Sequence, residues 1–170
     1  MDSLFPPLAR AIIYQQLSGR AAGTIHQRFR RLFPHSRPTA AATLRLDNRQ
    51  LRKAGLSDNK TRALYDLAAR VRARRLPAAR RLHEFDDSEL VARLTEVRGI
   101  GYWTVQMLLI FDLGRSDVLP VADLGIRKGM RRLDQLTELP GADWMRRRAQ
   151  AWRPFRSVAS WYLWRLAEAD

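Results

Sequence analysis

The sequence predicts an all-α fold. Apolar residues recur at helical spacing along most of the chain, and the apolar/polar alternation that marks a strand never lasts more than two or three residues. Residues that start and stop helices follow one another at short intervals. Because 170 residues suit one domain, or one body with two lobes, we predict a two-lobed helical bundle over residues 1–170, without a β-rich N-terminal domain.

The helices of the first half are indicated by their end residues. A short apolar helix follows Pro6 and Pro7, and capping and stop residues divide the chain that follows into three more helices. We predict helices over residues 8–17, 19–33, 48–54 and 58–75, with Ser18, Asp47 and Ser57 as N-terminal caps and Pro34 and Gly55 as stops.

The second half continues this pattern and contains one long non-helical stretch. Asp86 or Asp87 opens the first helix, Gly114 closes the second, and Pro154 suits the first turn of the last. Helices are predicted over residues 86–97, 102–113, 125–133 and 154–169, with an extended or looped segment at 115–124 and a turn at 137–144.

The composition favours a negatively charged partner. The net charge of +14 and the pI near 11.5 create a long-range field that attracts polyanions, and nucleic acid is the first candidate. A solubilising surface is the alternative. The chain has no cysteine, which excludes disulfides, cysteine-ligated iron–sulfur clusters, thiolate zinc sites and a cysteine nucleophile. No apolar run reaches the ~18 residues of a membrane span, and no signal peptide is recognisable, so we expect a cytoplasmic protein with no membrane partner.

The turn Gly99-Ile100-Gly101 joins two predicted helices and has the features of a phosphate-binding site. Glycines permit positive φ angles and let backbone N–H groups approach a ligand closely. The positive end of the following helix dipole favours an anion. Such a unit binds the DNA backbone without reading its sequence. Alone, the motif is an ordinary turn between helices; the charge of the chain shifts the interpretation toward phosphate binding.

Four motifs in order resemble the helix-hairpin-helix DNA glycosylase superfamily, in its DNA-3-methyladenine glycosylase II (alkylated-base) branch. They are ARAIIYQQLSGRAAGTI, VRGIGYWTVQMLLIF, DVLPVADLGIRKGM and AWRPFRSVASWYLWR, and they extend over nearly the whole chain. The resemblance implies a helix-hairpin-helix unit at about residues 87–114 and a catalytic loop at about residues 117–125. It also implies a monomer whose partner is duplex DNA that contains damaged bases.

The resemblance places the catalytic carboxylate at Asp123, in PVADLG. Cleavage of an N-glycosidic bond builds positive charge on the sugar, and a buried carboxylate stabilises that charge and orients or deprotonates the attacking water. Many members of the branch have two adjacent acidic residues here, whereas this chain has Ala122 before Asp123. The alternative is a helix cap for the residues from Leu124 onward, and the two roles are compatible.

Trp103 bears on the type of reaction. In bifunctional members of the superfamily a lysine at the matching position attacks the sugar as an amine. With tryptophan there, the resemblance implies attack by water, no lyase activity and no required cofactor. An aromatic face also attracts the cationic ring of an alkylated purine. The resemblance therefore implies a pocket for the flipped base formed by Trp103, Met107, Leu124 and Trp164, with core packing as the alternative. Of the other tryptophans, we expect Trp161 in the core and Trp152 at a helix entry.

A flipped base leaves a gap in the duplex that a side chain must fill, and the resemblance assigns this role to Gln16. Contacts with the DNA backbone are assigned to Gly99, Ile100, Gly101, Tyr102, Thr104, Lys60 and Arg127. Hairpin carbonyls in this superfamily often hold K⁺ or Na⁺, and the matching carbonyls belong to Thr95, Val97 and Gly99. The three histidines, His26, His35 and His83, lack the spacing of a metal site.

The preferred hypothesis is a monofunctional DNA glycosylase that excises alkylated purines such as 3-methyladenine in base excision repair. The hairpin, Asp123 and Trp103 together motivate it. Two alternatives stay open. A non-enzymatic helix-hairpin-helix module would bind DNA and release no base. A glycosylase for oxidised or deaminated bases would keep the chemistry and accept a neutral purine.

Overall fold

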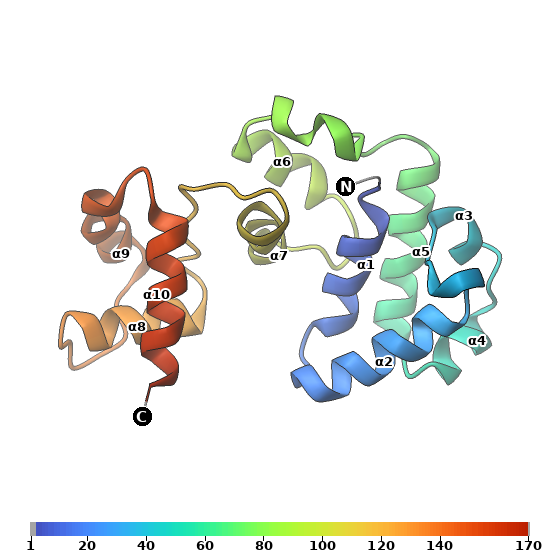
Figure 1. Ribbon diagram of the computed structural model, residues 1–170, viewed down its shortest axis with the longest axis horizontal. Helices are drawn as coiled ribbons and strands as arrows, with labels where there is room; N and C mark the ends of the chain where they lie inside the picture. Colours follow the sequence, from blue (N-terminus) through green and yellow to red (C-terminus); the bar gives the residue numbers. More distant parts are fainter. Residues whose placement is uncertain (1–2, 170) are drawn as a thin grey trace. The chain divides into compact units, whose positions relative to one another are not determined.

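The computed structural model describes residues 3–169, and all secondary structure in that range is helical (Figure 1). The predicted all-α class is confirmed. The chain divides into two compact units, residues 1–105 and residues 106–170. No described helix combines the length and the hydropathy needed to cross a bilayer. The α-helices of the described chain are α1 (Phe5–Tyr14), α2 (Gly19–Arg31), α3 (Ala40–Thr43), α4 (Asn48–Lys53), α5 (Asp58–Arg72), α6 (Asp87–Leu94), α7 (Tyr102–Met107), α8 (Leu124–Leu133), α9 (Ala142–Arg148) and α10 (Arg156–Glu168).

The predicted N-terminal caps are confirmed by hydrogen bonds from the first turns of α2, α4 and α5 to the side chains of Ser18, Asp47 and Ser57. Of the two candidates before α6, Asp86 is the cap, and it forms a reciprocal capping box with Glu89. Gly55 has a φ of +101°, which confirms it as the stop after α4. Local capping chemistry therefore sets the starts of α2, α4, α5 and α6 and the end of α4.

Several helix boundaries differ from the prediction. Because Pro6 and Pro7 fit the first turn, α1 begins at Phe5; it ends at Tyr14, so that Gln15 and Gln16 lie in the connection to α2. The helix predicted from Pro154 begins at Arg156. The helix predicted over residues 102–113 changes from α7 to a π-helical turn at Leu108–Asp112. The sequence analysis missed α9, because seven residues with three consecutive arginines show little apolar periodicity.

The first unit is built around α1 and α5, which pack against each other. α2 also contacts α1, while α3 and α4 contact α5. Full burial of an aliphatic side chain contributes about 1.5–3 kcal/mol, and the buried faces of α1 and α5 include Leu8, Ile12, Ile13, Leu64 and Leu67. This packing holds the C-terminal end of α1 next to the first turn of α5.

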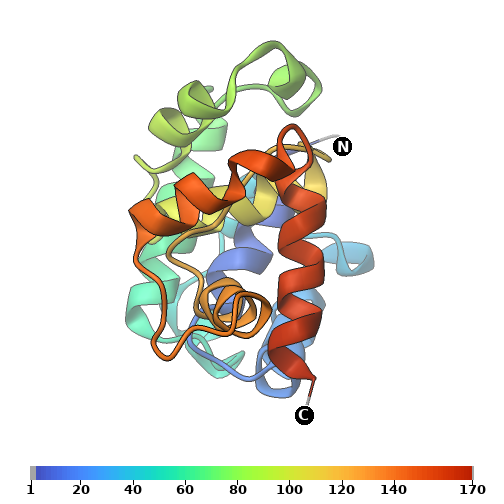
Figure 2. The same cartoon turned by 90° about the vertical axis from the view of Figure 1, so that its left-hand side faces the viewer.

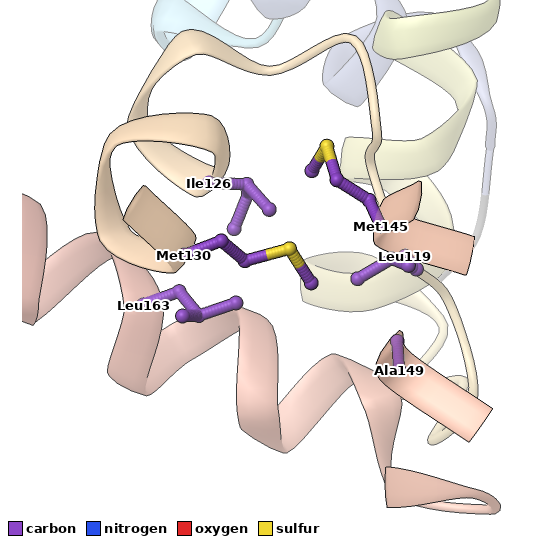
Figure 3. Packing of buried hydrophobic residues seen from close by; sticks show 6 residues of the cluster. All are labelled: Leu119, Ile126, Met130, Met145, Ala149 and Leu163. Atoms are coloured by element: carbon purple, nitrogen blue, oxygen red, sulfur yellow. The ribbon is translucent and has the colours of Figure 1, made fainter. Parts of the chain in front are cut away.

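The second unit depends on the contact between α8 and α10, which cross each other (Figures 1 and 2). Gly129 of α8 lies so close to the Leu163 backbone of α10 that no Cβ atom fits between them. The core of this unit surrounds the crossing and consists of Leu119, Ile126, Met130, Met145, Ala149 and Leu163 (Figure 3). The crossing brings the first turn of α8 next to the last turns of α10.

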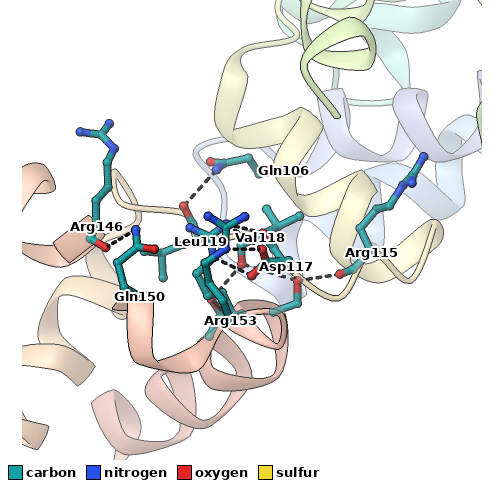
Figure 4. A network of polar contacts seen from close by, with 11 residues as sticks. Gln106, Arg115, Asp117, Val118, Leu119, Arg146, Gln150 and Arg153 are labelled. Carbon is teal, nitrogen blue, oxygen red and sulfur yellow. Dashed lines mark hydrogen bonds and ion pairs between the residues drawn. The ribbon is translucent and has the colours of Figure 1, made fainter. Parts of the chain in front are cut away.

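Polar contacts fasten the segment before α8 to the start of α10 (Figure 4). Ser157 Oγ donates to the Arg115 carbonyl at 2.6 Å and accepts from the Val118 N–H at 3.0 Å. The Arg156 guanidinium donates to both oxygens of Asp117, at 2.6 and 2.9 Å, and this hydrogen bonding lowers the pKa of Asp117. The loop therefore follows one fixed course into α8.

We expect Gly129→Ala to destabilise the second unit. The added methyl group would overlap the backbone of Leu163, and overpacking of this kind costs about 1–3 kcal/mol. Thermal unfolding followed by circular dichroism should show a lower Tm. Gly19→Ala is the matched control, because nothing lies within 4 Å of an added methyl group there. Equal Tm values for the two variants would contradict the close α8–α10 contact.

The Asp117–Arg156 pair should make stability depend on pH. Because the pKa of Asp117 is lowered in the folded protein, its contribution is fully present above the ordinary value of 3.8 and is lost as the pH falls through the lowered value. The pair is partly exposed, so we expect Asp117→Asn to cost only about 1 kcal/mol at pH 7. Urea unfolding at pH 7 and pH 3 should show a smaller acid-induced loss for the variant than for the wild type; equal losses would contradict the assignment.

Candidate functional site

Two hydrogen bonds fix the carboxylate of Asp123. Its Oδ1 accepts from the Ile126 backbone N–H at 2.9 Å and from the Trp164 indole Nε1–H at 2.8 Å. The first bond is the N-terminal cap of α8, so the capping role is confirmed. The second joins the start of α8 to α10. Two donors on one oxygen set the carboxylate plane, and the helix N-terminus stabilises its negative charge.

The indole of Trp164 is also held by an aromatic neighbour. Its ring stacks on Phe111, with 5.6 Å between the ring centroids and 25° between the planes. Phe111 lies on the π-helical turn after α7, and its side chain is 62% exposed. The sequence analysis missed Phe111, because the π turn that orients its ring has no sequence signature. Asp123, Trp164 and Phe111 thus form one cluster within the second unit.

Gly125 leaves the space that this cluster needs. A methyl group at Gly125 would lie 2.7 Å from Trp164 Cδ1 and 3.1 Å from Asp123 Oδ1. A side chain there would push the indole away from the carboxylate. The sequence signal for this space is a glycine two residues after the candidate acid.

The other predicted pocket residues differ in exposure. Leu124, directly after Asp123, is 53% exposed, and Met107 at the end of α7 is half-buried. Trp103 belongs to the first unit and is 44% exposed. Exposure of this extent argues against core packing for Leu124 and Trp103. Their role in a base pocket stays a prediction.

Two further tryptophans have different outcomes. The prediction that Trp161 lies in the core is wrong: the side chain is 49% exposed and contacts Tyr162 and Arg165. Helical spacing alone could not show that this face of α10 is not covered by other elements of the second unit. Trp152 lies in the short helical segment before α10, half-buried against the core of the second unit, as expected for a helix entry.

In the first unit, the hairpin between α6 and α7 packs on α5. Gly99 has a φ of +78°, and a methyl group there would lie 3.2 Å from the Ala63 side chain. Gly101 and Tyr102 are exposed at the start of α7. Ile100 differs, since its side chain is 3% exposed and its N–H donates to the Val97 carbonyl at 3.0 Å. The structure therefore makes Ile100 an anchor of the turn, with an N–H group that is not available to a phosphate.

Gln15 ties the segment after α1 to the hairpin. Its Nε2 donates to the Gly99 carbonyl at 2.7 Å and to Thr104 Oγ1 at 3.4 Å. The next residue, Gln16, is exposed and has a φ of +55°, a conformation that costs energy for a residue with a side chain. The predicted gap-filling residue is thus a strained, exposed side chain directly after the residue that contacts the hairpin.

The two predicted backbone-binding cations make contacts within the protein. Lys60 Nζ donates to the carbonyls of Ile13 and Gln15, at 2.7 and 2.8 Å, and burial lowers the pKa of Lys60. Lys60 therefore caps the C-terminal end of α1. Arg127 Nε donates to the Pro140 carbonyl at 3.2 Å. Contact of either residue with DNA stays a prediction.

The predicted cation ligands are backbone oxygens of the hairpin. The Val97 carbonyl accepts from the Ile100 N–H, and the Gly99 carbonyl accepts from Gln15. A carbonyl oxygen has two lone pairs, so each of these atoms keeps one acceptor site beside its hydrogen bond, and cation binding by them and the Thr95 carbonyl stays a prediction. Among the described residues, no group of three or more His, Cys, Asp or Glu side chains is placed to bind a metal.

Comparison with known proteins shows the family of the chain. Residues 9–154 match the model of the HhH-GPD superfamily of base excision DNA repair proteins. The chain is 36% identical to DNA-3-methyladenine glycosylase 1 of Schizosaccharomyces pombe, over 96% of this chain and 72% of the relative. A solved structure of S. pombe 3-methyladenine DNA glycosylase in complex with abasic DNA matches 95% of this chain and 79% of its own, with a TM-score of 0.86 and 36% identity. A DNA-3-methyladenine glycosidase from Bacillus halodurans matches with a TM-score of 0.89 and 32% identity, over 99% of this chain and 77% of its own. The chain belongs to the HhH-GPD superfamily of base excision DNA repair proteins.

Proposed function

We propose that this chain is a monofunctional DNA glycosylase that hydrolyses the N-glycosidic bond of alkylated purines in duplex DNA. The observation that carries the proposal is the Asp123 carboxylate, held by two donors next to an aromatic pair. Further support comes from two similar proteins of solved structure, the S. pombe 3-methyladenine DNA glycosylase in complex with abasic DNA and the B. halodurans DNA-3-methyladenine glycosidase. Abasic DNA is what remains after a base has been removed.

In the proposed reaction the bond between sugar C1′ and the purine nitrogen breaks first. Its electron pair leaves with the base, and the sugar becomes an oxocarbenium ion that the Asp123 carboxylate stabilises. The oxygen of a water molecule then bonds to C1′, and Asp123 accepts the proton. A cationic alkylated purine departs as a neutral base, so the step needs no acid catalyst. With Trp103 in place of an amine nucleophile, the strand stays intact.

The hairpin and the segment after α1 are the DNA-binding elements that we propose for the first unit. Gly99, Gly101 and Tyr102, at the turn and the start of α7, bind backbone phosphate through N–H groups and the helix dipole. The predicted contact Thr104 is 5% exposed and its hydroxyl accepts from Gln15, so its side chain supports the turn. Gln16 fills the gap left by the flipped nucleotide. Its strained backbone supports this role, because strain at an exposed residue persists where the surrounding contacts fix it.

The proposal also covers the base pocket, the oligomeric state, the cellular location and a bound cation. Trp103, Trp164, Met107 and Leu124 contact the flipped base, and the aromatic faces favour a cationic ring. The protein acts as a monomer on damaged duplex DNA in the cytoplasm, and chemistry at Asp123 needs no cofactor. A K⁺ or Na⁺ ion bound by the carbonyls of Thr95, Val97 and Gly99 would stiffen the hairpin. Lys60 and Arg127 add positive charge that attracts the DNA backbone.

We expect Asp123→Asn to lower the rate of base excision by at least about 100-fold, the scale of losing one electrostatic group at a reacting centre. Asparagine still caps a helix and accepts the Trp164 hydrogen bond, so the fold should persist. Single-turnover release of 3-methyladenine from methylated duplex DNA measures the rate, and circular dichroism checks the fold. Asp143→Asn, at an exposed ion pair, is the control. Undiminished base release by Asp123→Asn would exclude the mechanism. If the wild-type protein binds the duplex and releases no base, the alternative of a non-enzymatic DNA-binding module is favoured.

We expect Gln15→Ala to slow excision from a correctly paired duplex about 10-fold, because the segment that carries Gln16 loses its hydrogen bond to the hairpin, worth about 1–1.5 kcal/mol. A lesion in a mispair is cheaper to flip, so its excision should slow less. Single-turnover rates on the two duplexes give the ratio. Gln27→Ala, on the exposed face of α2, is the control. Equal slowing on both duplexes would contradict this positioning role.

A further inference from the structure

The first unit has a second basic feature, separate from the hairpin. A cavity of about 890 Å³ is lined by the end of α5, the segment that follows it and Arg93 in the last turn of α6, and no acidic residue is among the described residues that line it. Five arginines line it: Arg74, Arg75, Arg80, Arg81 and Arg93. The segment that supplies most of them, residues 74–81, is not part of any motif used above. Five guanidinium groups around one concave surface repel one another unless an anion compensates their charge.

Few of these charges are compensated within the protein. Arg74, Arg75 and Arg80 form no ion pair with any residue in the described range 3–169. Arg81 pairs with Glu84 at 2.7 Å, but both side chains are largely exposed, at 60% and 43%. An exposed pair of this kind is worth little, so Arg81 can exchange Glu84 for a ligand oxygen.

An aromatic side chain orients the fifth guanidinium. The Arg93 guanidinium carbon lies 5.0 Å from the centroid of the Phe85 ring, within cation–π distance. Phe85 is half-buried at the edge of the cavity. Stacking on one face leaves the N–H groups at the rim of the guanidinium free to point at an anion. A planar guanidinium held in this way donates two parallel hydrogen bonds to phosphate oxygens.

The end of α5 has an unusual residue for its conformation. Arg74 has a φ of +53°, and the Arg75 N–H donates to the Arg70 carbonyl at 3.0 Å, which closes the helix with a left-handed residue. Glycine is the common residue at this position because it has no Cβ penalty. Arginine there costs stability, and the turn directs the chain, with Arg74 and Arg75, along the cavity. A costly arginine at a cavity wall indicates a ligand that uses its charge.

We propose that this arginine cavity binds phosphate groups of a nucleic-acid backbone, as a second anion site of the protein. It is separate from the glycine turn of the hairpin: Gly99 packs on Ala63 near the start of α5, whereas the cavity begins at the C-terminal end of α5, about 14 Å further along the helix axis. The site goes beyond the proposed function, since backbone binding here does not require base excision. Free polyphosphates carry the same phosphate groups, so the experiments distinguish a nucleic-acid backbone from a free polyphosphate as the ligand.

The first experiment compares two triple variants of the full chain. Arg74→Gln/Arg75→Gln/Arg80→Gln removes three cavity charges, and Arg28→Gln/Arg45→Gln/Arg49→Gln removes three exposed charges that line neither the cavity nor the hairpin. Anisotropy with a labelled undamaged duplex gives the slope of log K against log salt. Each lost phosphate contact reduces that slope by about 0.9, so we expect the cavity variant to lose about 2 to 3 and the control far less. The readout does not depend on Asp123.

The second experiment uses Arg74→Gly. Glycine relieves the left-handed strain, so we expect the Tm of the protein to rise while DNA affinity falls and the salt slope shrinks by about 1. A purely structural arginine would not move stability and affinity in opposite directions. In parallel, the change in Tm on addition of inorganic pyrophosphate is measured for the wild type, the cavity variants and the control variant. A lower DNA affinity and a smaller salt slope in the cavity variants support a nucleic-acid backbone as the ligand. If these variants bind DNA normally and lose only the shift in Tm caused by pyrophosphate, the backbone is overturned as the ligand and a free polyphosphate is assigned. Cavity and control variants that behave alike in both arms overturn the site.

Discussion

The candidate site depends on one carboxylate oxygen that accepts two hydrogen bonds. Asp123 Oδ1 begins α8 through Ile126 and holds the indole of Trp164 on α10. This geometry requires the two helices to approach closely, and glycines at two positions of α8 allow it. Gly129 admits the backbone of α10, and Gly125 leaves room for the indole. Packing and chemistry are therefore inseparable here, because a shift of either helix moves the carboxylate.

In the first unit, polar side chains hold the end of α1 and the segment after it in place. Gln15 and Lys60 tie the end of α1 to the hairpin and to α5, and these contacts hold Gln16 in a strained conformation. The large positive charge of the chain is distributed unevenly around this framework. Some arginines are neutralised in ion pairs, whereas Arg74, Arg75 and Arg80 beyond α5 converge on a cavity and form no ion pair with any described residue. Net charge thus indicates the class of ligand, and tertiary structure decides where it binds.

Local sequence signals predicted most of the fold. Capping residues such as Asp47 and Ser57 act within one helical turn, so their effect is readable without knowledge of the tertiary structure. The prediction failed where distant parts of the chain decide. Helix α9 has little apolar periodicity, and its Met145 packs in the core of the second unit. Trp161 has helical spacing like a core residue, yet no element of the second unit covers it.

The sequence by itself determined the helical class, the capped starts of several helices, the hairpin turn and the candidate acid, Asp123. These features depend on residue type and short spacing. Only the tertiary structure showed that Trp164 donates to Asp123, that Gly125 must lack a side chain and that Gln15 reaches the hairpin, 84 residues away. Such contacts join residues from different helices. Their geometry follows from how those helices pack, which no local pattern encodes.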